Sequence, residues 1–130
     1  MGAVQKEVML RGLECHQMII DGIIEELNLE AYAFDIRLIL IEAVTNAYYH
    51  GNLSDCSKPI TIRYLLRDKL LKLQIEDSGA GGGVLLFPET ISNEELLEDG
   101  GRGLYLIRCF SDTVERVDNT MYISKSICSS

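Results

Sequence analysis

Apolar side chains recur every three and four residues in two segments of the first half of the chain, the spacing typical of amphipathic helices. The first segment runs from Glu14 to Leu27, and Asn28 is expected to end it. The second runs from about Ala31 to Tyr49, and the Gly51-Asn52 pair is expected to end it. One stripe of this second helix carries Phe34, Leu38, Ile41, Thr45 and Tyr48, and Ile39, Ala43 and Ala47 lie beside it. A third, buried helix is predicted over Leu104–Phe110.

Alternation of apolar and polar residues predicts strands in much of the remaining chain. The expected strands are Val4–Leu10, Ile60–Leu66, Leu70–Asp77, Thr113–Val117 and Met121–Lys125. The first is left open, because its residues do not alternate cleanly. Short turns at Arg67-Asp68-Lys69 and Asp118-Asn119 join the other four into two hairpins. Asp77 is in phase with the apolar residues of its strand, so its carboxylate is expected to point to the covered face, where it needs a partner.

The order of these elements predicts an α+β fold. Helices come first, followed by a strand pair, a long irregular segment, a helix and a second strand pair. We expect a two-layer α/β sandwich in which the helices cover one face of a mixed, largely antiparallel sheet. A length of 130 residues is typical of one domain, and no internal repeat is visible. The sequence therefore predicts a single domain over residues 1–130.

Composition and charge exclude several classes of protein. The chain is 47% hydrophobic and 25% charged, which argues against disorder, a collagen or a coiled coil. It carries 20 acidic and 12 basic side chains, for a formal net charge of -8. Binding to nucleic acid or to an anionic membrane needs clustered Lys and Arg, so neither partner is expected. A single nucleotide can still bind through backbone amides and a metal.

Cysteine spacing and the absence of an apolar leader favour a cytoplasmic protein. The cysteines are Cys15, Cys56, Cys109 and Cys128, and no two of them form a C-x-x-C pair that would suggest a zinc site or a redox dithiol. Lys6, Glu7 and Arg11 interrupt the start of the chain, which therefore lacks the apolar region of a signal peptide. No apolar run approaches the roughly 20 residues that span a bilayer. In the cytoplasm the thiols would stay reduced and the Asn52 sequon would be unused.

Polar residues interrupt the apolar second helix in a way that suggests chemistry. Glu42 and Asn46 lie four residues apart and therefore about one turn apart on one face. They could form an intrahelical hydrogen bond facing solvent. Alternatively, Glu42 is a base and Asn46 is an oxygen ligand for a hard cation such as Mg2+. His50, one turn further on, could take part in the site or could simply interact with the dipole at the helix end.

Two glycine clusters flank an acidic segment that is long for a loop. The clusters are Gly79-Ala80-Gly81-Gly82-Gly83 and Gly100-Gly101-Arg102-Gly103. The first cluster does not complete G-x-G-x-x-G, because Val84 occupies the last glycine position, and the chain contains no Gly-Lys-Ser/Thr of a Walker A loop. A plain flexible turn remains an alternative. Loops of more than about 12 to 15 residues are often lids or binding loops.

Taken in order, these motifs resemble the GHKL, or Bergerat-fold, ATPase superfamily. Residues 42–47 with His50-Gly51-Asn52 resemble the N-box of these proteins, Asp77-Ser78-Gly79-Ala80-Gly81 resembles their D-x-G-x-G motif, and residues 101–107 resemble their last glycine box and its helix. The resemblance covers nearly the whole chain. At this size, the chain is most similar to anti-sigma-factor serine kinases.

The resemblance implies a role for each matching residue. Asn46 would hold Mg2+ against the triphosphate, and Asp77 would accept a hydrogen bond from the adenine amino group. The glycines Gly79, Gly81, Gly101 and Gly103, with Leu104 at the start of the last helix, would let the backbone approach the nucleotide. Arg102 would reach the γ-phosphate or the protein substrate, unless it is an exposed loop arginine. Residues 84–99 would form the ATP lid.

Glu42 separates the branches of the superfamily that the chain resembles. Sensor histidine kinases do not use a base at this place, and gyrase-type members, which resemble the chain in Glu42, complete their sites with a second domain. The resemblance therefore implies an ATP- and Mg2+-dependent serine kinase that phosphorylates a small antagonist protein, binds a sigma factor and forms a homodimer. The alternative is a catalytically weak module of the same fold that binds ATP and protein partners. A scaffold without nucleotide would leave the polar residues unexplained. The segment Gly82-Gly83-Val84 and the acidic lid depart from the usual family pattern.

Overall fold

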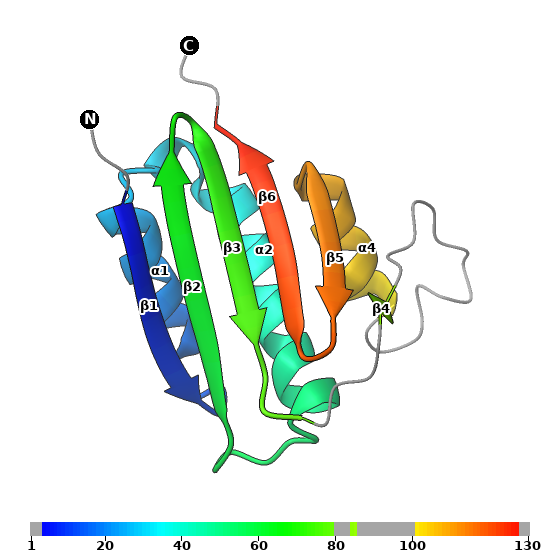
Figure 1. Cartoon of the computed structure of the whole chain (residues 1–130). Helices are drawn as coiled ribbons and strands as arrows, with labels where there is room; N and C mark the ends of the chain where they lie inside the picture. The colour runs from blue at the N-terminus through cyan, green and yellow to red at the C-terminus, as the bar shows by residue number, and fades with distance from the viewer. Residues whose placement is uncertain (1–3, 80–83, 86–100, 128–130) are drawn as a thin grey trace.

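A computed structural model of the chain describes residues 4–79, 84–85 and 101–127. The strands are β1 (Val4–Arg11), β2 (Pro59–Arg67), β3 (Leu70–Glu76), β4 (Val84–Leu85), β5 (Thr113–Val117) and β6 (Thr120–Ser126). They form one sheet in the order β1-β2-β3-β6-β5-β4, in which every pairing of the described strands is antiparallel (Figure 1). The predicted strands are confirmed to within one or two residues, including the irregular first one, and the edge strand β4 is an addition.

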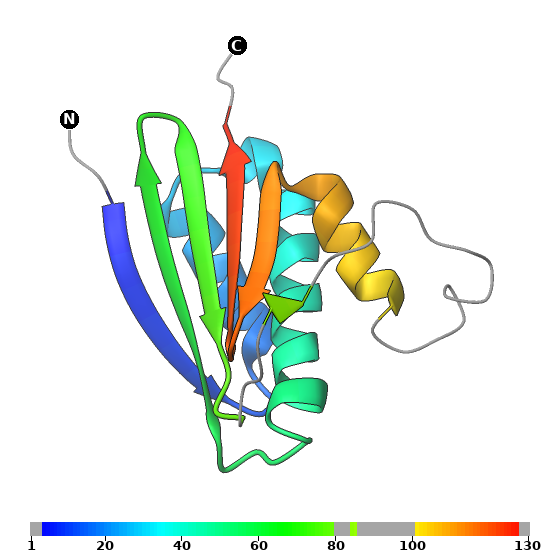
Figure 2. The ribbon, with the colours of Figure 1, turned by 45° about the vertical axis from the view of Figure 1, so that its right-hand side comes forward.

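The helices lie together on one face of this sheet, as the view in Figure 2 shows. They are α1 (His16–Glu26), the 3-10 turn η1 (Glu30–Tyr32), α2 (Ala33–Asn46), the π-helical turn η2 (Ala47–Gly51) and α4 (Gly101–Phe110). The predicted end of α1 is confirmed, because Asn28 adopts a left-handed conformation with φ 56° just after the helix. The two-layer α+β sandwich expected from the sequence is therefore the observed fold.

The hairpins form where the sequence places them. Asp68 and Lys69 both have positive φ, 51° and 65°, as a two-residue type I′ turn between β2 and β3 requires. Asp118, with φ 55°, begins the corresponding turn between β5 and β6. The antiparallel register that follows from these turns pairs Ile75 with Met121 at the centre of the sheet. Their side chains share the face that the helices cover.

The core lies between the sheet and α2, and the fully buried side of α2 contains Ile39 and Ala43, which were expected beside the main apolar stripe and not on it. The buried residues of α2 are Ile36, Ile39, Leu40, Ala43 and Val44, and Ala47 at the start of η2 is buried as well. Phe34, predicted on the apolar stripe, is 69% exposed and packs its ring edge-on against Phe110 of α4, with centroids 6.1 Å apart. The correction has a simple reason: α2 lies over the sheet (Figure 2) and also packs against α1 and α4, so apolar residues occur on more than one stripe.

A polar contact ties α1 and β1 to the sheet core. The Tyr64 hydroxyl donates to Glu26 at 2.5 Å, and Glu26 also forms an ion pair with Lys6 of β1. Burial, followed by the hydrogen bond to Glu26, raises the pKa of Tyr64 to about 12. The phenol therefore stays protonated and continues to donate over the whole physiological pH range.

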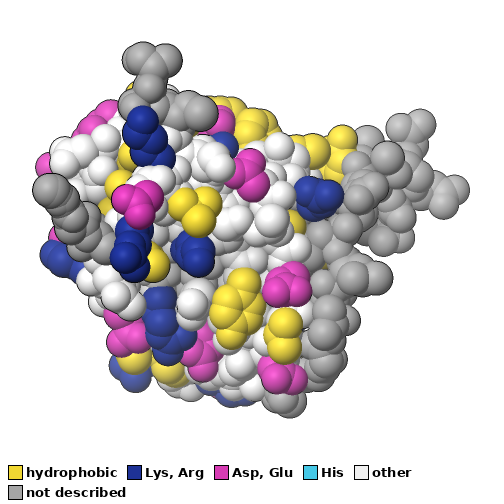
Figure 3. Space-filling view, turned by 45° about the horizontal axis from the view of Figure 1, so that its top comes forward, with side chains coloured by type: hydrophobic (Ala, Val, Ile, Leu, Met, Phe, Trp, Pro, Cys, Tyr) yellow, Lys and Arg dark blue, Asp and Glu magenta, His cyan; other side chains and the backbone are white. Residues whose placement is uncertain are grey.

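The two ends of the sheet differ in what they bring together. The C-terminal end of α2, the end of β3 and the turn between β5 and β6 lie at one end, which we call the α2 end; β1 begins and β6 finishes at the opposite end (Figure 1). The face of the sheet without helices carries acidic and basic side chains with scattered hydrophobic ones (Figure 3). On that face Arg63 forms ion pairs with Glu7 and Glu76, both at 2.7 Å. The candidate site residues Glu42, Asn46 and Asp77 lie instead on the helix side of the sheet, toward the α2 end.

Candidate nucleotide site

The polar face of α2 is available for a ligand. Glu42 and Asn46 are both half-buried. Within the described part of the chain, neither side chain has a hydrogen bond or ion pair, so the intrahelical Glu–Asn bond considered as an alternative is not formed. A half-buried carboxylate and amide without protein partners suit a site that is completed by a bound molecule.

Glu42 lies directly against the last glycine box. A Cβ placed on Gly103 would come within 2.5 Å of Glu42 Oε2, so only a glycine lets α4 approach this carboxylate so closely. The helix α4 starts at Gly101, three residues before the predicted start, so that Gly101 and Gly103 belong to its first turn. The N-terminus of a helix attracts anions through its free amides and its dipole. Glu42 is therefore held beside a helix end that is suited to phosphate.

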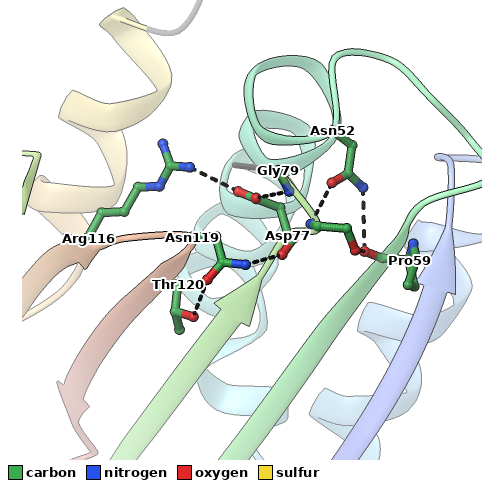
Figure 4. Close-up of polar contacts among 8 residues, drawn as sticks. Asn52, Pro59, Asp77, Gly79, Arg116, Asn119 and Thr120 are labelled. Carbon is green, nitrogen blue, oxygen red and sulfur yellow. Dashed lines mark hydrogen bonds and ion pairs between the residues drawn. The ribbon is translucent and has the colours of Figure 1, made fainter. Parts of the chain in front are cut away.

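Asp77 follows β3 at the other end of the candidate site and is, as predicted, an inward carboxylate. Its side chain is only 4% exposed. Asp77 Oδ1 accepts from the Gly79 amide at 2.8 Å, and Oδ2 accepts from Arg116 Nη2 at 3.0 Å (Figure 4). Asn119 exchanges backbone and side-chain hydrogen bonds with the Asp77 main chain, at 2.9 and 2.8 Å. The partners that a buried carboxylate needs are thus supplied by Arg116 of β5 and the Gly79 amide, while Asn119 holds the Asp77 main chain.

The turn after α2 packs tightly against Asp77. A Cβ on Gly51 would lie 2.0 Å from Asp77 Oδ2, and one on Gly79 would lie 2.2 Å from the carbonyl oxygen of Gly51. Asn52 is fully buried and fastens this turn: its Nδ2 donates to the Lys58 carbonyl at 3.0 Å, and its Oδ1 accepts from the Ser78 amide at 2.7 Å. A longer contact of Nδ2 with the Pro59 carbonyl, at 3.5 Å, is drawn in Figure 4. Gly51, Asp77 and Gly79 therefore form one close-packed unit.

The π-helical turn η2 extends the α2 helix to this unit. The Asn52 amide donates to the Ala47 carbonyl at 2.8 Å, a spacing of five residues that defines π geometry. The predicted second helix thus continues past Tyr49 to Gly51, with a changed hydrogen-bond pattern. Turns of this kind occur mostly as single insertions, often at functional sites. His50 lies in this turn and is exposed.

Several predicted site residues cannot be placed in full. Gly81 and residues 86–99 of the expected ATP lid lie outside the described residues, as does the side chain of Arg102. Val84 and Leu85, the first two residues of that expected lid, form β4 and pair with Val117 and Arg116 of β5. Leu104 is half-buried and packs against the core. The structure thus brings Glu42 to Gly103 and Asp77 to Gly79, with Asn46 on α2 between the two pairs.

Arg116 and Asn119 are site residues that sequence reasoning missed. The signal for Arg116 was present, because it alternates in phase with Val114 on β5 and so belongs on the covered face. In the structure it pairs across the strands with Met121, a buried core residue. A basic residue in phase with the core could have been matched to Asp77, the inward acidic residue.

The arrangement fits a nucleotide and Mg2+. From Glu42 to Gly51 the helix spans about 14 Å at 1.5 Å per residue. The N-terminus of α4, which suits a phosphate, lies beside Glu42, and the buried Asp77 carboxylate lies beside Gly51. Gly103 beside Glu42, and Gly51 and Gly79 beside Asp77, carry no Cβ that would fill the space next to these two carboxylates. Asn46 contributes a neutral oxygen, the kind of ligand that Mg2+ accepts when nucleotide phosphates provide others.

Comparison with known proteins agrees with this geometry. The family described as "Histidine kinase-like ATPase domain" matches residues 9–124. Anti-sigma F factors of Bacillus thuringiensis (strain Al Hakam), Bacillus mycoides (strain KBAB4) and Bacillus cereus (strain AH187) are each 28% identical over 120 residues, which covers 85% of this chain and 77% of each relative. Among the described residues, no helix is both long and apolar enough to cross a membrane. The resemblance deduced from the motifs is confirmed, and the chain belongs to the histidine kinase-like ATPase domain family.

Proposed function

We propose that the protein is an ATP- and Mg2+-dependent serine kinase of the anti-sigma-factor type. It would transfer the γ-phosphoryl group of ATP to a serine hydroxyl of a small antagonist protein, and it would also bind a sigma factor. The observation that carries the proposal is the contact of Glu42 with Gly103 at the start of α4. The similarity to anti-sigma F factors supports the choice of partners.

Each end of the site has a separate task in this proposal. Asp77 accepts a hydrogen bond from the adenine amino group, and Gly79 and Gly81 let the backbone approach the base. Gly101, Gly103 and Leu104 present the first turn of α4 to the phosphates, with Arg102 directed to the γ-phosphate. Bound Mg2+, held by Asn46, would neutralise charge on the phosphates. His50 lies one turn beyond Asn46 and is the outermost residue of the site.

Glu42 acts on the incoming hydroxyl. Phosphoryl transfer depends mainly on positioning and on stabilising charge, so a carboxylate contributes by orienting the hydroxyl and taking its proton. Glu42 has no protein partner within the described residues and stands at the helix end that would hold the transferred group. It can therefore serve as the general base.

The test is a transfer assay with purified components. The protein is incubated with γ-labelled ATP, Mg2+ and the small antagonist encoded nearest to it, and phosphoserine is then measured on that antagonist. Labelled serine is the expected result. Tight binding of ATP and partner without any labelled serine would instead support the catalytically weak regulatory module.

Replacing Gly103 with alanine is expected to lower the rate of phosphate transfer without lowering the thermal stability of the protein. The new Cβ would meet Glu42 Oε2 at 2.5 Å, and this flexible end of the side chain can move away. Alanine is favoured over glycine in a helix by about 1 kcal/mol, so thermal stability should be equal or higher. Displacement of a catalytic group by about 1 Å can lower a rate about 10²-fold. Thermal unfolding and transfer rates measured on the same preparation check this, and an unchanged rate would contradict the role of Glu42.

Replacing Asn46 with alanine is expected to abolish the enhancement of ATP binding by Mg2+. The change removes one neutral oxygen from a half-buried position and strands no charge, so the fold should remain. Calorimetric titration with ATP, with Mg2+ and with EDTA, measures the enhancement. Gln74→Ala, which removes a half-buried amide from the helix-free face of β3, is the matched control and should keep the full Mg2+ effect.

We also propose that residues 1–130 act as one cytoplasmic domain that forms a homodimer. No nucleic-acid or membrane partner is part of the proposal, in keeping with the acidic net charge of -8.

A further inference from the structure

The helix α2 carries apolar side chains on two opposite sides, and only one of them faces the sheet. The residues that face the sheet include Leu40 and Ala43, each of which is 0% exposed. Phe34, Leu38 and Ile41 recur at spacings of four and three residues on the opposite side, and so form a second stripe. Phe34 is 69% exposed, and Leu38 and Ile41 are half-buried. We call these three residues the outer stripe of α2.

The proposed nucleotide site does not account for the outer stripe. That site uses Glu42, which lies against Gly103 of α4, and Asn46, one turn further along the same side. A helix at the surface of a domain normally carries polar residues on the side away from the core, and a helix that is apolar all round is normally buried. Phe110 meets the Phe34 ring edge-on and still leaves most of it exposed. The outer stripe therefore has the composition of a surface that a further molecule covers.

The exposed apolar surface continues onto the neighbouring helix α1. Arg37, next to Leu38, donates to Asp21 Oδ1 at 2.9 Å and so holds α1 alongside α2. Met18 lies one turn before Asp21 on α1 and is 70% exposed. Gly22, one turn after Met18, has no atom within 4 Å of the position of its Cβ. The helix α1 therefore adds an exposed apolar side chain and an unobstructed stretch of backbone to the outer stripe.

The helices around the outer stripe are acidic. Glu25 of α1 and Glu30 of η1 are exposed, and within the part of the chain that the structure describes neither has a hydrogen bond or ion pair. Glu30 stands four residues before Phe34, so its carboxylate lies near the end of the outer stripe. Arg37 is the one lysine or arginine of α1, η1 and α2, and Asp21 already pairs with it. This charge favours a partner with lysine or arginine and disfavours a second copy of the same acidic face.

We propose that the outer stripe of α2, together with Met18, docks an amphipathic helix of a partner protein whose apolar side is flanked by lysine or arginine. The apolar side of that helix covers the outer stripe, and its basic flanks pair with Glu25 and Glu30. Docked helices of this kind present apolar anchors at spacings of three and four residues, which is the spacing of the outer stripe itself. The interaction uses no residue of the nucleotide site, so it goes beyond the proposed function and holds with or without ATP.

The test uses two synthetic helical peptides as probes and the whole chain as the receptor. Both peptides have the same leucine side, and their flanking residues are all lysine in one and all glutamate in the other. Fluorescence anisotropy titrations without nucleotide give the two dissociation constants. We expect the lysine peptide to bind at least about tenfold more tightly. Equal dissociation constants, or no binding of the lysine peptide, would overturn the inference.

Phe34→Ser and Met18→Ser test where the lysine peptide binds. Each removes a mostly exposed apolar side chain, so the fold should remain, and each should weaken binding of the lysine peptide about tenfold. Met9→Ser, which removes an exposed methionine from β1, is the matched control and should keep the full affinity. Unchanged affinity in both Phe34→Ser and Met18→Ser would place the peptide elsewhere on the protein and contradict the proposed docking surface.

Two further measurements test the charge and the occupant. Glu30→Gln should reduce the preference for the lysine peptide, whereas Glu115→Gln, which neutralises an exposed carboxylate on β5, should leave it unchanged. A preference that Glu30→Gln does not change would count against the pairing of charges. Sedimentation equilibrium of the unaltered chain and of Phe34→Ser should give the same assembly state. A dimer that Phe34→Ser converts to a monomer would assign the outer stripe to a second copy of the chain and overturn the choice of partner.

Discussion

The Glu42→Gln protein is expected to transfer phosphate about 10² to 10⁴ times more slowly than the unaltered protein, with almost the same affinity for ATP. Glutamine keeps the size of the side chain and its contact with Gly103, but it cannot take a proton. Nucleotide binding depends on Asp77, Asn46 and the first turn of α4, none of which this change removes. The loss should therefore appear in the transfer step alone.

Single-turnover transfer at matched nucleotide occupancy is the measurement for Glu42→Gln. Glu25→Gln, which neutralises an exposed carboxylate on α1, is the matched control and should keep the full rate. Binding of the antagonist in the presence of nucleotide should persist in both variants. A transfer rate indifferent to Glu42→Gln would rule out the general-base mechanism even if the kinase activity itself were real.

The Gly51→Ala protein is expected to lose about 3 to 5 kcal/mol of its free energy of unfolding, the cost of breaking a buried ion pair. The added Cβ would lie 2.0 Å from Asp77 Oδ2 and 2.1 Å from Asp77 Cγ. The carboxylate cannot simply turn away, because the Gly79 amide and Arg116 hold it on either side. Either the helix end or the Asp77–Arg116 pair has to move.

Urea unfolding compares Gly51→Ala with Gly22→Ala. Gly22 lies in α1 with no atom within 4 Å of the position of its Cβ, so alanine there should stabilise the protein by about 0.5 to 1 kcal/mol. The two substitutions add the same methyl group, and only the neighbours differ. A Gly51→Ala protein as stable as the unaltered chain would show that the close packing of the turn on Asp77 is not maintained in solution.

Alternation and turn residues predicted the sheet well. Strands β2, β3 and β5 lie within two residues of the expected bounds, because side chains that alternate between a covered and an open face leave a clear period of two. The start of α4 and the buried stripe of α2 were less predictable. Both depend on which neighbour a helix face meets, as Phe34 against Phe110 illustrates, and that information is not local in the sequence.

The candidate site was predictable where its residues form motifs. Glu42, Asp77 and the glycines follow a spacing along the chain, and the structure brings Glu42 to Gly103 and Asp77 to Gly79. Arg116 belongs to no motif, and its contact with Asp77 joins residues 39 positions apart. The phase of Arg116 along β5 indicates that its side chain faces the core, but the strand order β3-β6-β5 that brings it to Asp77 is defined only by the folded sheet.

The position of the outer ends of β1 and β6 matters for the design of experiments. Val4 and Ser126 stand at the end of the sheet opposite Asp77, separated from it by the length of β3, about 23 Å for seven residues. A fluorophore attached near either of these residues, or a surface to which they are coupled, would leave the α2 end open to solution. Labelled or immobilised protein is therefore suitable for titrations with nucleotides.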